Sequence, residues 1–262
     1  ISGGIDLSIG YMASLCGIVA AMLMKNMNVN FIVSIIAAIL VGTLCGALNG
    51  ILSNKLKIHT MIVTLATMTL FQGLSYIISQ SKSFSSLPAA FKFIGQGYLG
   101  NLPVSIFALI AIVAVVSFIL NKTHYGRYVY AIGGNPDAAH LAGINVERVR
   151  LRTFALNGAL VGLAAVLLIS RSGSASSAMG TSLQFDSITA CILGGVSFTG
   201  GSGKVSNAVL GVLCLGVLSN GMQLIGWGIY VQYVVKAILL VIAIAFDMYT
   251  KNKVLADDAA NG

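Results

Sequence analysis

Charged residues are scarce in this sequence. The 15 basic and 7 acidic side chains make up 8% of its 262 residues, whereas soluble globular domains average about 25%. A protein dissolved in water needs charge over its surface. The scarcity therefore excludes an ordinary soluble enzyme, a soluble nucleic-acid-binding domain and a disordered chain, and we expect no nucleic acid among the partners.

Cysteine and histidine are also rare, and their spacing indicates no metal centre. No two of the four cysteines form a Cys-x-x-Cys pair, and the three histidines stand alone. The cysteines lie inside apolar runs, which predicts small buried side chains. No Ser-His-Asp set and no pair of catalytic carboxylates stands out. We therefore expect no metal, no cofactor and no catalytic residue.

Apolar residues dominate the remainder of the sequence. Hydrophobic residues make up 57% of the chain, and the mean hydropathy is +0.92. A helix of about 20 apolar residues crosses a bilayer, and about eight apolar runs occur, of which 187–199 is short and fits a re-entrant or broken helix. The run at 104–120 is apolar on every side, which excludes the alternating pattern of a membrane β-barrel. The runs are 8–24, 31–52, 60–79, 102–121, 152–170, 187–199, 205–223 and 230–248.

These runs predict an all-α polytopic membrane protein that forms a single transmembrane domain over residues 1–262. Sidedness follows from the basic residues, because Lys and Arg gather in cytoplasmic loops. The segment 122–151 is the most basic, and we expect it to be a cytoplasmic loop. Alternation along the chain then places the loops at 25–30, 80–101 and 171–186 outside. The basic residues in and next to this cytoplasmic loop are Lys122, Arg127, Arg148, Arg150 and Arg152.

Two stretches of small residues resemble each other. GTLCGALNG at 42–50 and GVLCLGVLSNG at 211–221 both carry Leu-Cys near the start and Asn-Gly at the end, and a lone acid, Asp6 or Asp186, precedes each. The alternation of sides gives the two stretches opposite orientations. We therefore predict an inverted repeat, which is a transporter architecture. The alternative is that Gly, Leu and Ala recur through composition alone.

A short helix is expected inside the cytoplasmic loop. Asn135 is a preferred N-cap residue, Pro136 suits the first helical position, and Asp137 suits the positive end of the helix dipole. Gly143 is a typical C-terminal stop. These signals predict a helix at about 136–142. Because so short a helix does not persist alone in water, we expect it to dock on the membrane domain or on a soluble partner.

The same loop carries a resemblance to a known family. DAAHLAG at 137–143 resembles the Glu-Ala-Ala-x-x-x-Gly loop in the permease subunits of ATP-binding-cassette (ABC) importers, with Asp137 in place of the Glu. The wider sequence resembles the branch that imports simple sugars of the ribose, xylose and galactose type. The family's first span or two are absent, so we expect an N-terminal piece to be missing. The resemblance covers nearly the whole chain and is carried by residues 3–10, 62–69, 130–144, 193–203 and 232–236.

The resemblance implies a set of partners. In such importers two permease subunits, identical or different, form the channel in the lipid bilayer of the bacterial cytoplasmic membrane. Two ATPase subunits grip the short cytoplasmic helices, and a periplasmic or lipid-anchored protein delivers the sugar. The shorter acid at Asp137 leaves open whether it reaches a partner or only caps the helix. The residues assigned to ATPase coupling are Asn135, Pro136, Asp137, Ala138, Ala139 and Gly143.

The residues GGSGK at 200–204 superficially match a phosphate-binding loop. That pattern requires a glycine where the sequence has Phe198 and a Ser or Thr where it has Val205. We therefore expect a flexible cytoplasmic turn that does not bind ATP. The chain is then not an enzyme by itself, and ATP hydrolysis is expected in a partner subunit.

Polar residues within membrane spans are costly and therefore mark candidate functional positions. Asn157, Asn207 and Gln232 are such residues, but for any one Asn hydrogen bonding between helices is the alternative. Lys236 is expected to extend to the outer face. The Ser- and Gly-rich residues 172–187 fit either a flexible linker or a docking or gate element. The leading candidates for the translocation path are Asp6, Asn49, Asp186, Asn220 and Gln223.

The sequence thus predicts the permease subunit of an ABC importer for a monosaccharide or a similar small polar solute, working by alternating access. The alternative is an ion-coupled secondary transporter with inverted repeats, in which Asp6 and Asp186 bind protons or sodium ions. An integral membrane enzyme would need several ionisable residues at one depth, and the sequence shows no such cluster.

Overall fold

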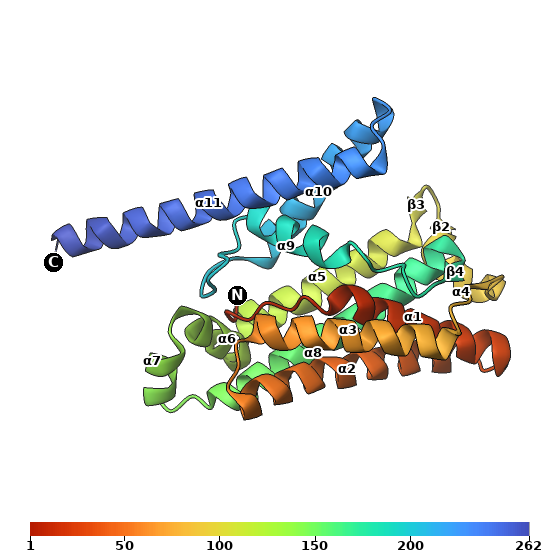
Figure 1. Cartoon of the computed structure of the whole chain (residues 1–262), viewed down its shortest axis with the longest axis horizontal. Coiled ribbons are helices and arrows are strands. Elements are labelled where there is room, and N and C mark those ends of the chain that lie inside the picture. Colours follow the sequence, from red (N-terminus) through yellow and green to blue (C-terminus); the bar gives the residue numbers. More distant parts are fainter. Residues whose placement is uncertain (262) are drawn as a thin grey trace. The chain divides into compact units, whose positions relative to one another are not determined.

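The computed structural model describes the backbone of residues 1–261 and the side chains of residues 1–251 and 253. This part of the chain is built mainly from helices, with two short antiparallel strand pairs (Figure 1). The helices are α1 (Ile9–Asn26), α2 (Phe31–Leu56), α3 (Thr60–Ser79), α4 (Ala89–Gln96), α5 (Val104–Lys122), α6 (His124–Gly134), α7 (Pro136–Leu141), α8 (Val146–Ser172), α9 (Leu183–Leu193), α10 (Val205–Leu224) and α11 (Ile229–Asn261). The strands are β1 (Phe84–Ser85), β2 (Tyr98–Leu99), β3 (Leu102–Pro103) and β4 (Ser174–Ala175).

Seven of the helices that the structure describes are long and apolar enough to cross a membrane: α1, α2, α3, α5, α8, α10 and α11. They coincide with the seven longer apolar runs, which confirms the prediction of a polytopic all-α membrane protein. The short run forms α9 instead. Its 11 residues extend about 17 Å at 1.5 Å per residue, about half of a hydrocarbon layer about 30 Å thick. As a single helix α9 is too short to span.

Two helix boundaries differ from the apolar runs that predicted them, for local reasons. α8 starts at Val146, well before the run at 152–170, because the side chain of Asn145 caps it by accepting a hydrogen bond from the backbone N–H of Arg148 at 2.9 Å. α9 ends before its run does, because Gly195 follows with a φ of 80°, which a right-handed helix does not contain. Capping and turn chemistry, rather than hydropathy, set these ends.

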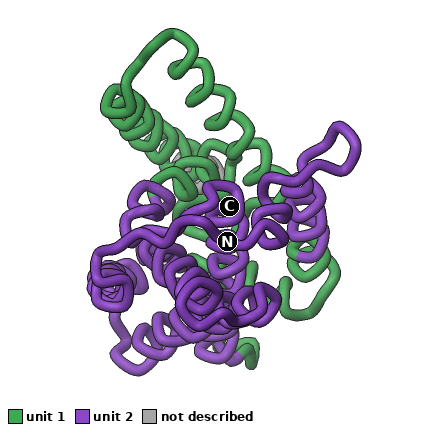
Figure 2. The backbone as a smooth tube through the Cα atoms, turned by 90° about the vertical axis from the view of Figure 1, so that its right-hand side faces the viewer, with its two compact units in different colours: residues 1–3, 116–144, 185–262 green, residues 4–115, 145–184 purple. Residues whose placement is uncertain are grey.

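The chain folds as two compact units (Figure 2). Unit 2 comprises residues 4–115 and 145–184 and holds α1 to α4, α8 and all four strands. Unit 1 comprises residues 1–3, 116–144 and those from 185 onward, and holds α6, α7, α9, α10 and α11. The division at residue 115 falls within α5, and the division after residue 184 falls within the first turn of α9. Both units are therefore assembled from stretches that are far apart in the sequence.

α2 and α8 pack in unit 2 with their backbones in direct contact. A Cβ atom added at Gly42 would lie 2.2 Å from the carbonyl oxygen of Gly158, and one added at Gly46 would lie 2.1 Å from that of Phe154. Small residues let membrane helices approach closely, so these glycines set the distance between the two helices. The glycines on the contact face are Gly42, Gly46 and Gly50 on α2 and Gly158 and Gly162 on α8.

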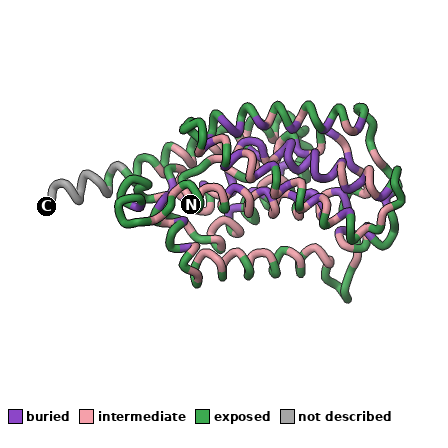
Figure 3. The backbone as a smooth tube through the Cα atoms, turned by 90° about the horizontal axis from the view of Figure 1, so that it is seen from below, coloured by how far each residue is buried: buried purple, intermediate pink, exposed green. Residues whose placement is uncertain are grey.

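α1 lies at the centre of unit 2. Most of its residues are buried, and it packs against α2, α3 and α8. Figure 3 shows buried residues gathered along the helices of the bundle. Met12, Phe71 and Phe91 are among the largest buried side chains of the unit. A helix that other helices surround has no need of a polar face, which explains why this stretch of the sequence is apolar throughout.

The Ser- and Gly-rich segment after α8 is packed onto unit 2. β4 pairs with β1, and the hydroxyl groups of Ser177 and Ser79 lie 2.8 Å apart. The backbone N–H of Gly180 donates to the hydroxyl of Ser14 on α1 at 3.0 Å. Of the two interpretations left open by the sequence, a flexible linker therefore does not describe residues 173–184.

The expectation that all four cysteines are buried is correct for two of them. Cys16 and Cys45 are buried, whereas Cys191 is half-buried and Cys214 is exposed. Cys214 lies on α10, where a different face, which includes Gly211, carries the buried residues. The apolar character of the run did not reveal which face of α10 packs.

Candidate functional site

α7 begins at a strong N-cap. The side-chain oxygen of Asn135 accepts hydrogen bonds from the backbone N–H groups of Asp137 and Ala138, both at 3.0 Å. Pro136 occupies the first helical position, where its missing N–H costs nothing. Because Asn135 supplies the cap, the carboxylate of Asp137 is not needed for capping, and it is exposed.

α7 ends in a closed turn. The N–H of Gly143 donates to the carbonyl of His140, and the N–H of Ile144 donates to the carbonyl of Ala139, both at 3.0 Å. These two bonds form a Schellman motif. It requires a left-handed residue, which Gly143 supplies with a φ of 82°. With both ends bonded in this way, α7 keeps its helical form despite having only six residues.

The faces of α7 differ in exposure. Ala139 is only 4% exposed and belongs to the face that packs, whereas Ala138 is exposed. Leu141 is 88% exposed, which is unusual for a large aliphatic side chain on so short a helix. The free surface of α7 therefore combines the carboxylate of Asp137 with Ala138 and the side chain of Leu141. Of the two alanines that the sequence assigned to one contact surface, only Ala138 is exposed.

A polar cluster lies in unit 2 just before α1. The carboxylate of Asp6 accepts hydrogen bonds from the backbone N–H of Ser8 at 2.9 Å, from the Ser8 hydroxyl at 2.6 Å and from Nδ2 of Asn157 at 3.0 Å. Nδ2 of Asn49 donates to the Ser8 hydroxyl at 2.8 Å and lies 3.5 Å from Asp6. The cluster joins the segment before α1 to α2 through Asn49 and to α8 through Asn157.

The same segment is bound to α3. The hydroxyl of Thr64 donates to the carbonyl of Ile5 at 3.2 Å and accepts from the N–H of Leu7 at 3.1 Å. The hydroxyl of Thr60 accepts from the N–H of Ile5 at 3.2 Å. We call residues 4–8 the N-terminal strap. Non-helical backbone at membrane depth needs protein partners for its polar groups, and these two threonines supply them.

Asn49 is fully buried, and its orientation has an electrostatic cause. Its amide hydrogens point to Asp6 and Ser8, because the carboxylate attracts the NH₂ group and repels the amide oxygen. Among the side chains that the structure describes, Oδ1 of Asn49 is one of two buried polar atoms that have no hydrogen-bond partner, and Oε1 of Gln184 is the other. Leaving an acceptor unpaired is costly, so the bond to the strap is the interaction that fixes this residue.

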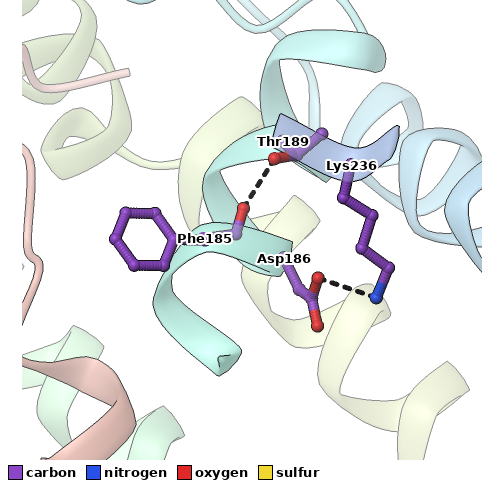
Figure 4. A network of polar contacts seen from close by, with 4 residues as sticks. All are labelled: Phe185, Asp186, Thr189 and Lys236. Atoms are coloured by element: carbon purple, nitrogen blue, oxygen red, sulfur yellow. Dashed lines mark hydrogen bonds and ion pairs between the residues drawn. The ribbon is translucent and has the colours of Figure 1, made fainter. Parts of the chain in front are cut away.

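The second acidic path candidate, Asp186, lies in unit 1 and has a cationic partner. Its Oδ1 is 2.9 Å from Nζ of Lys236, and the two side chains are 34% and 19% exposed respectively (Figure 4). The pair joins the first turn of α9 to α11. Nζ of Lys236 is therefore directed to Asp186. Asp186 ends the segment 171–186 that we expect outside, so the extension of Lys236 to the outer face stays a prediction. Thr189 donates to the carbonyl of Phe185 at 2.7 Å, within α9.

The remaining path candidates lie on α10. Asn220 and Gln223 are exposed and belong to unit 1, as Asp186 does. Asp6 and Asn49 are the two candidates that the structure joins in one cluster. In the described part of the chain, no group of three or more His, Cys, Asp or Glu residues is placed to hold a metal ion.

The comparisons with known proteins assign the family. Residues 1–244 match the family described as branched-chain amino acid transport system / permease component. The chain belongs to this permease family. It is 36% identical over 256 residues to the ribose import permease protein RbsC of Haemophilus influenzae, covering 96% of this chain and 79% of that protein. It is 39% identical over 248 residues to the L-arabinose transport system permease protein AraH of Escherichia coli, covering 95% and 75%.

A third relative carries the transporter class in its name. The chain is 34% identical over 251 residues to the L-arabinose ABC transporter permease protein AraH of Azospirillum brasilense, covering 96% of this chain and 74% of that protein. No solved structure matches the chain. Together with the seven apolar helices, the family membership makes this permease a multi-pass protein of the bacterial inner membrane and confirms the resemblance drawn from the motifs.

Proposed function

We propose that this permease is the membrane-spanning subunit of an ABC importer for a monosaccharide or a similar small polar solute. The observation that carries the proposal is the similarity of nearly the whole chain to permeases named for ribose import and L-arabinose transport. Solute crosses by alternating access, driven by ATP hydrolysis in separate subunits. A second permease subunit completes the channel, and a periplasmic or lipid-anchored binding protein delivers the solute.

α7 is the proposed contact with the ATPase. Its exposed surface offers one carboxylate, Asp137, beside the small Ala138 and the apolar Leu141. The bonds at both ends hold this surface in one shape, so a partner does not have to order it on binding. Asn135, Pro136 and Gly143 act by building the helix rather than by contact, and the buried Ala139 belongs to the face that packs.

In unit 2, the contacts of the polar cluster support different roles for its members. Asn49 is fully buried, which supports a structural role in holding the strap. Asp6 is half-buried, and its Oδ2 accepts one hydrogen bond, from Asn157. A carboxylate oxygen has two lone pairs, so Asp6 can accept a further bond from a sugar hydroxyl. We therefore retain Asp6 as a candidate for the path, and Asp186, Asn220 and Gln223 remain candidates too.

The predicted inverted repeat also remains a proposal. Its two stretches fall in different units, 42–50 in unit 2 and 211–221 in unit 1. Each lies in the second helix of a run of three, α1 to α3 or α9 to α11. Accessibility of single cysteines at Lys55 and Lys204 to a membrane-impermeant reagent tests the orientation. Both are expected to react only from the cytoplasmic side, and opposite sides for the two positions would remove the repeat.

Transport in reconstituted vesicles tests the proposed function. The full-length permease, purified with its ATPase subunits and supplied with the binding protein, is placed in vesicles, and uptake of labelled ribose and L-arabinose is measured. We expect uptake that requires ATP and that persists when ionophores collapse proton and sodium gradients. Uptake that needs an ion gradient but no ATP would establish the secondary transporter instead.

A further inference from the structure

The residues between α9 and α10, which the sequence excludes as an ATP-binding loop, have a specific conformation in unit 1. We call residues 195–203 the glycine-rich turn. Gly195, Gly200, Gly201 and Gly203 all have positive φ, between 80° and 131°. Residues other than glycine rarely adopt such angles, so the path of the backbone through this turn depends on its glycines.

Part of the turn contacts the end of α6 backbone to backbone. A Cβ atom added at Gly133 would lie 1.9 Å from the carbonyl oxygen of Ile1 and 2.5 Å from the backbone nitrogen of Gly201, whose N–H donates to that carbonyl at 2.8 Å. A Cβ atom added at Gly200 would lie 2.6 Å from the Cα atom of Gly3 and 3.1 Å from the carbonyl oxygen of Gly133. Residues 1–3 therefore share this contact. One helical turn earlier, the hydroxyl of Tyr130 donates to the carbonyl of Gly203 at 2.8 Å. No side chain separates Gly133 from the turn.

Other residues of the turn bind α11. The N–H of Phe198 donates to Oδ2 of Asp247 at 3.0 Å, and the hydroxyl of Ser197 lies 3.4 Å from the same oxygen. Nζ of Lys251 donates to the hydroxyl of Thr199. The turn also connects α9 to α10 along the chain (Figure 1). The helices α9, α10 and α11 therefore meet at this turn, which lies in unit 1.

α6 is joined to α7 by a single residue, Asn135. The backbone N–H of Asn135 donates to the carbonyl of Ala131 at 3.0 Å and closes α6. Its side chain caps α7. A displacement of α7 is therefore passed to the last turn of α6, and this is the part of α6 that contacts the glycine-rich turn through Gly133.

We infer that the glycine-rich turn transmits the movement of α7 to α9, α10 and α11. The inference rests on the proposed function, in which partner ATPases move α7. Backbone atoms in contact have no alternative rotamers, so a displacement at Gly133 is passed on rather than absorbed by side chains, as expected for close-packed contacts. Gly133 and Tyr130 are then positioning residues, which couple the subunits without touching ATP or solute.

A matched pair of alanine substitutions tests this role. Gly133→Ala places a methyl group against the carbonyl of Ile1 and against Gly201 of the turn, whereas a Cβ atom at the neighbouring Gly134 meets nothing within 4 Å. Both changes raise helix propensity at the end of α6 equally. The readout is solute imported per ATP hydrolysed, in vesicles that hold the assembled transporter. Gly133→Ala should keep its ATPase subunits and hydrolyse ATP but lower this ratio about tenfold, within the usual range of coupling between sites. Gly134→Ala should stay close to wild type.

An unchanged ratio in Gly133→Ala, or an equal fall in both variants, would overturn the inference. Because the methyl group of Gly133→Ala also meets Ile1, Tyr130→Phe is measured as well, since it removes only the hydroxyl bond to Gly203. The inference requires a lower ratio with intact assembly in Tyr130→Phe, and a wild-type ratio there would overturn it. Failure of the proposed function itself is a different result, because the wild-type protein would then bind no ATPase or import solute without ATP.

Discussion

Asp186 and Lys236 form an ion pair, 2.9 Å between Oδ1 and Nζ, that joins the short helix α9 to the spanning helix α11. The pair neutralises both charges, so Asp186 needs neither a proton nor a sodium ion to be tolerated among apolar helices. This counts against the ion-coupled alternative, which uses Asp186 as an ion site. It also explains how a helix too short to span is held in place within unit 1.

Asp186→Asn should destabilise the protein, because it leaves the largely buried ammonium group of Lys236 unpaired. Removing one partner of a fully buried pair costs about 3–5 kcal/mol, and we expect less, about 1–3 kcal/mol, for this partly exposed one. Thermal unfolding in detergent measures the effect. The double variant Asp186→Asn/Lys236→Gln should recover part of the loss, and a single variant as stable as wild type would show that the pair does not hold α9.

Gly42→Ala should separate α2 from α8. The added methyl group meets a backbone carbonyl that cannot rotate away, and overpacking of this kind costs about 1–3 kcal/mol. Gly73→Ala on α3 is the matched control, since its Cβ atom meets nothing within 4 Å, and it should gain up to about 1 kcal/mol of helix propensity. The melting temperatures should move in opposite directions, and equal shifts would contradict the proposed close contact.

Asp6→Asn should release the N-terminal strap. The change replaces a carboxylate that accepts bonds from Ser8 and Asn157 with an amide that offers one oxygen and no charge. Hydrogen bonds to a charged group are worth about 1.5–3 kcal/mol. Burial raises the pKa of the Asp6 carboxyl, so the charged form also bears a desolvation cost that the amide escapes. Thermal unfolding should therefore show a loss smaller than that value, whereas Asp137→Asn, at an exposed acid on α7, should leave the melting temperature close to that of wild type.

Changes on α7 and at its C-terminal turn should stop transport while the membrane-spanning helices stay folded. Ala138→Arg and Leu141→Arg each add a positive charge at an exposed position, so both proteins should insert and melt as wild type does. Gly143→Trp enters open space but requires a left-handed tryptophan, at about 1–2 kcal/mol, and should distort the end of α7. Each variant should lose ATP-driven uptake, and normal uptake in all three would remove the coupling role of α7.

The features that the sequence predicted are set by nearby residues. Seven spans follow from apolar runs, and the bounds of α7 follow from capping signals at Asn135 and Gly143 that act within a few positions. The division of Ala138 from Ala139 could not be predicted, because the face that α7 buries depends on where α6 lies. The exposure of Cys214 was missed for a similar reason, because the face that α10 buries depends on where its neighbouring helices lie.

The N-terminal strap was missed because its bonds join distant parts of the sequence. Thr64 binds Leu7 across 57 positions, and Asn157 binds Asp6 across 151. No helical or strand period links such residues. Ser8 had a local signal, since an Asp two positions before a Ser favours the turn in which the carboxylate accepts the Ser N–H, and this signal was available at Asp6.

Co-purification tests the central claim most directly. The full-length permease is tagged, solubilised in mild detergent and analysed for subunits that accompany it, in the wild type and in Ala138→Arg. We expect an ATPase subunit in stoichiometric amount with the wild type and its loss in the variant, while the permease remains folded. A wild-type preparation without an ATPase, or an ATPase that the α7 variant retains in full, would contradict the claim that this permease is driven through α7.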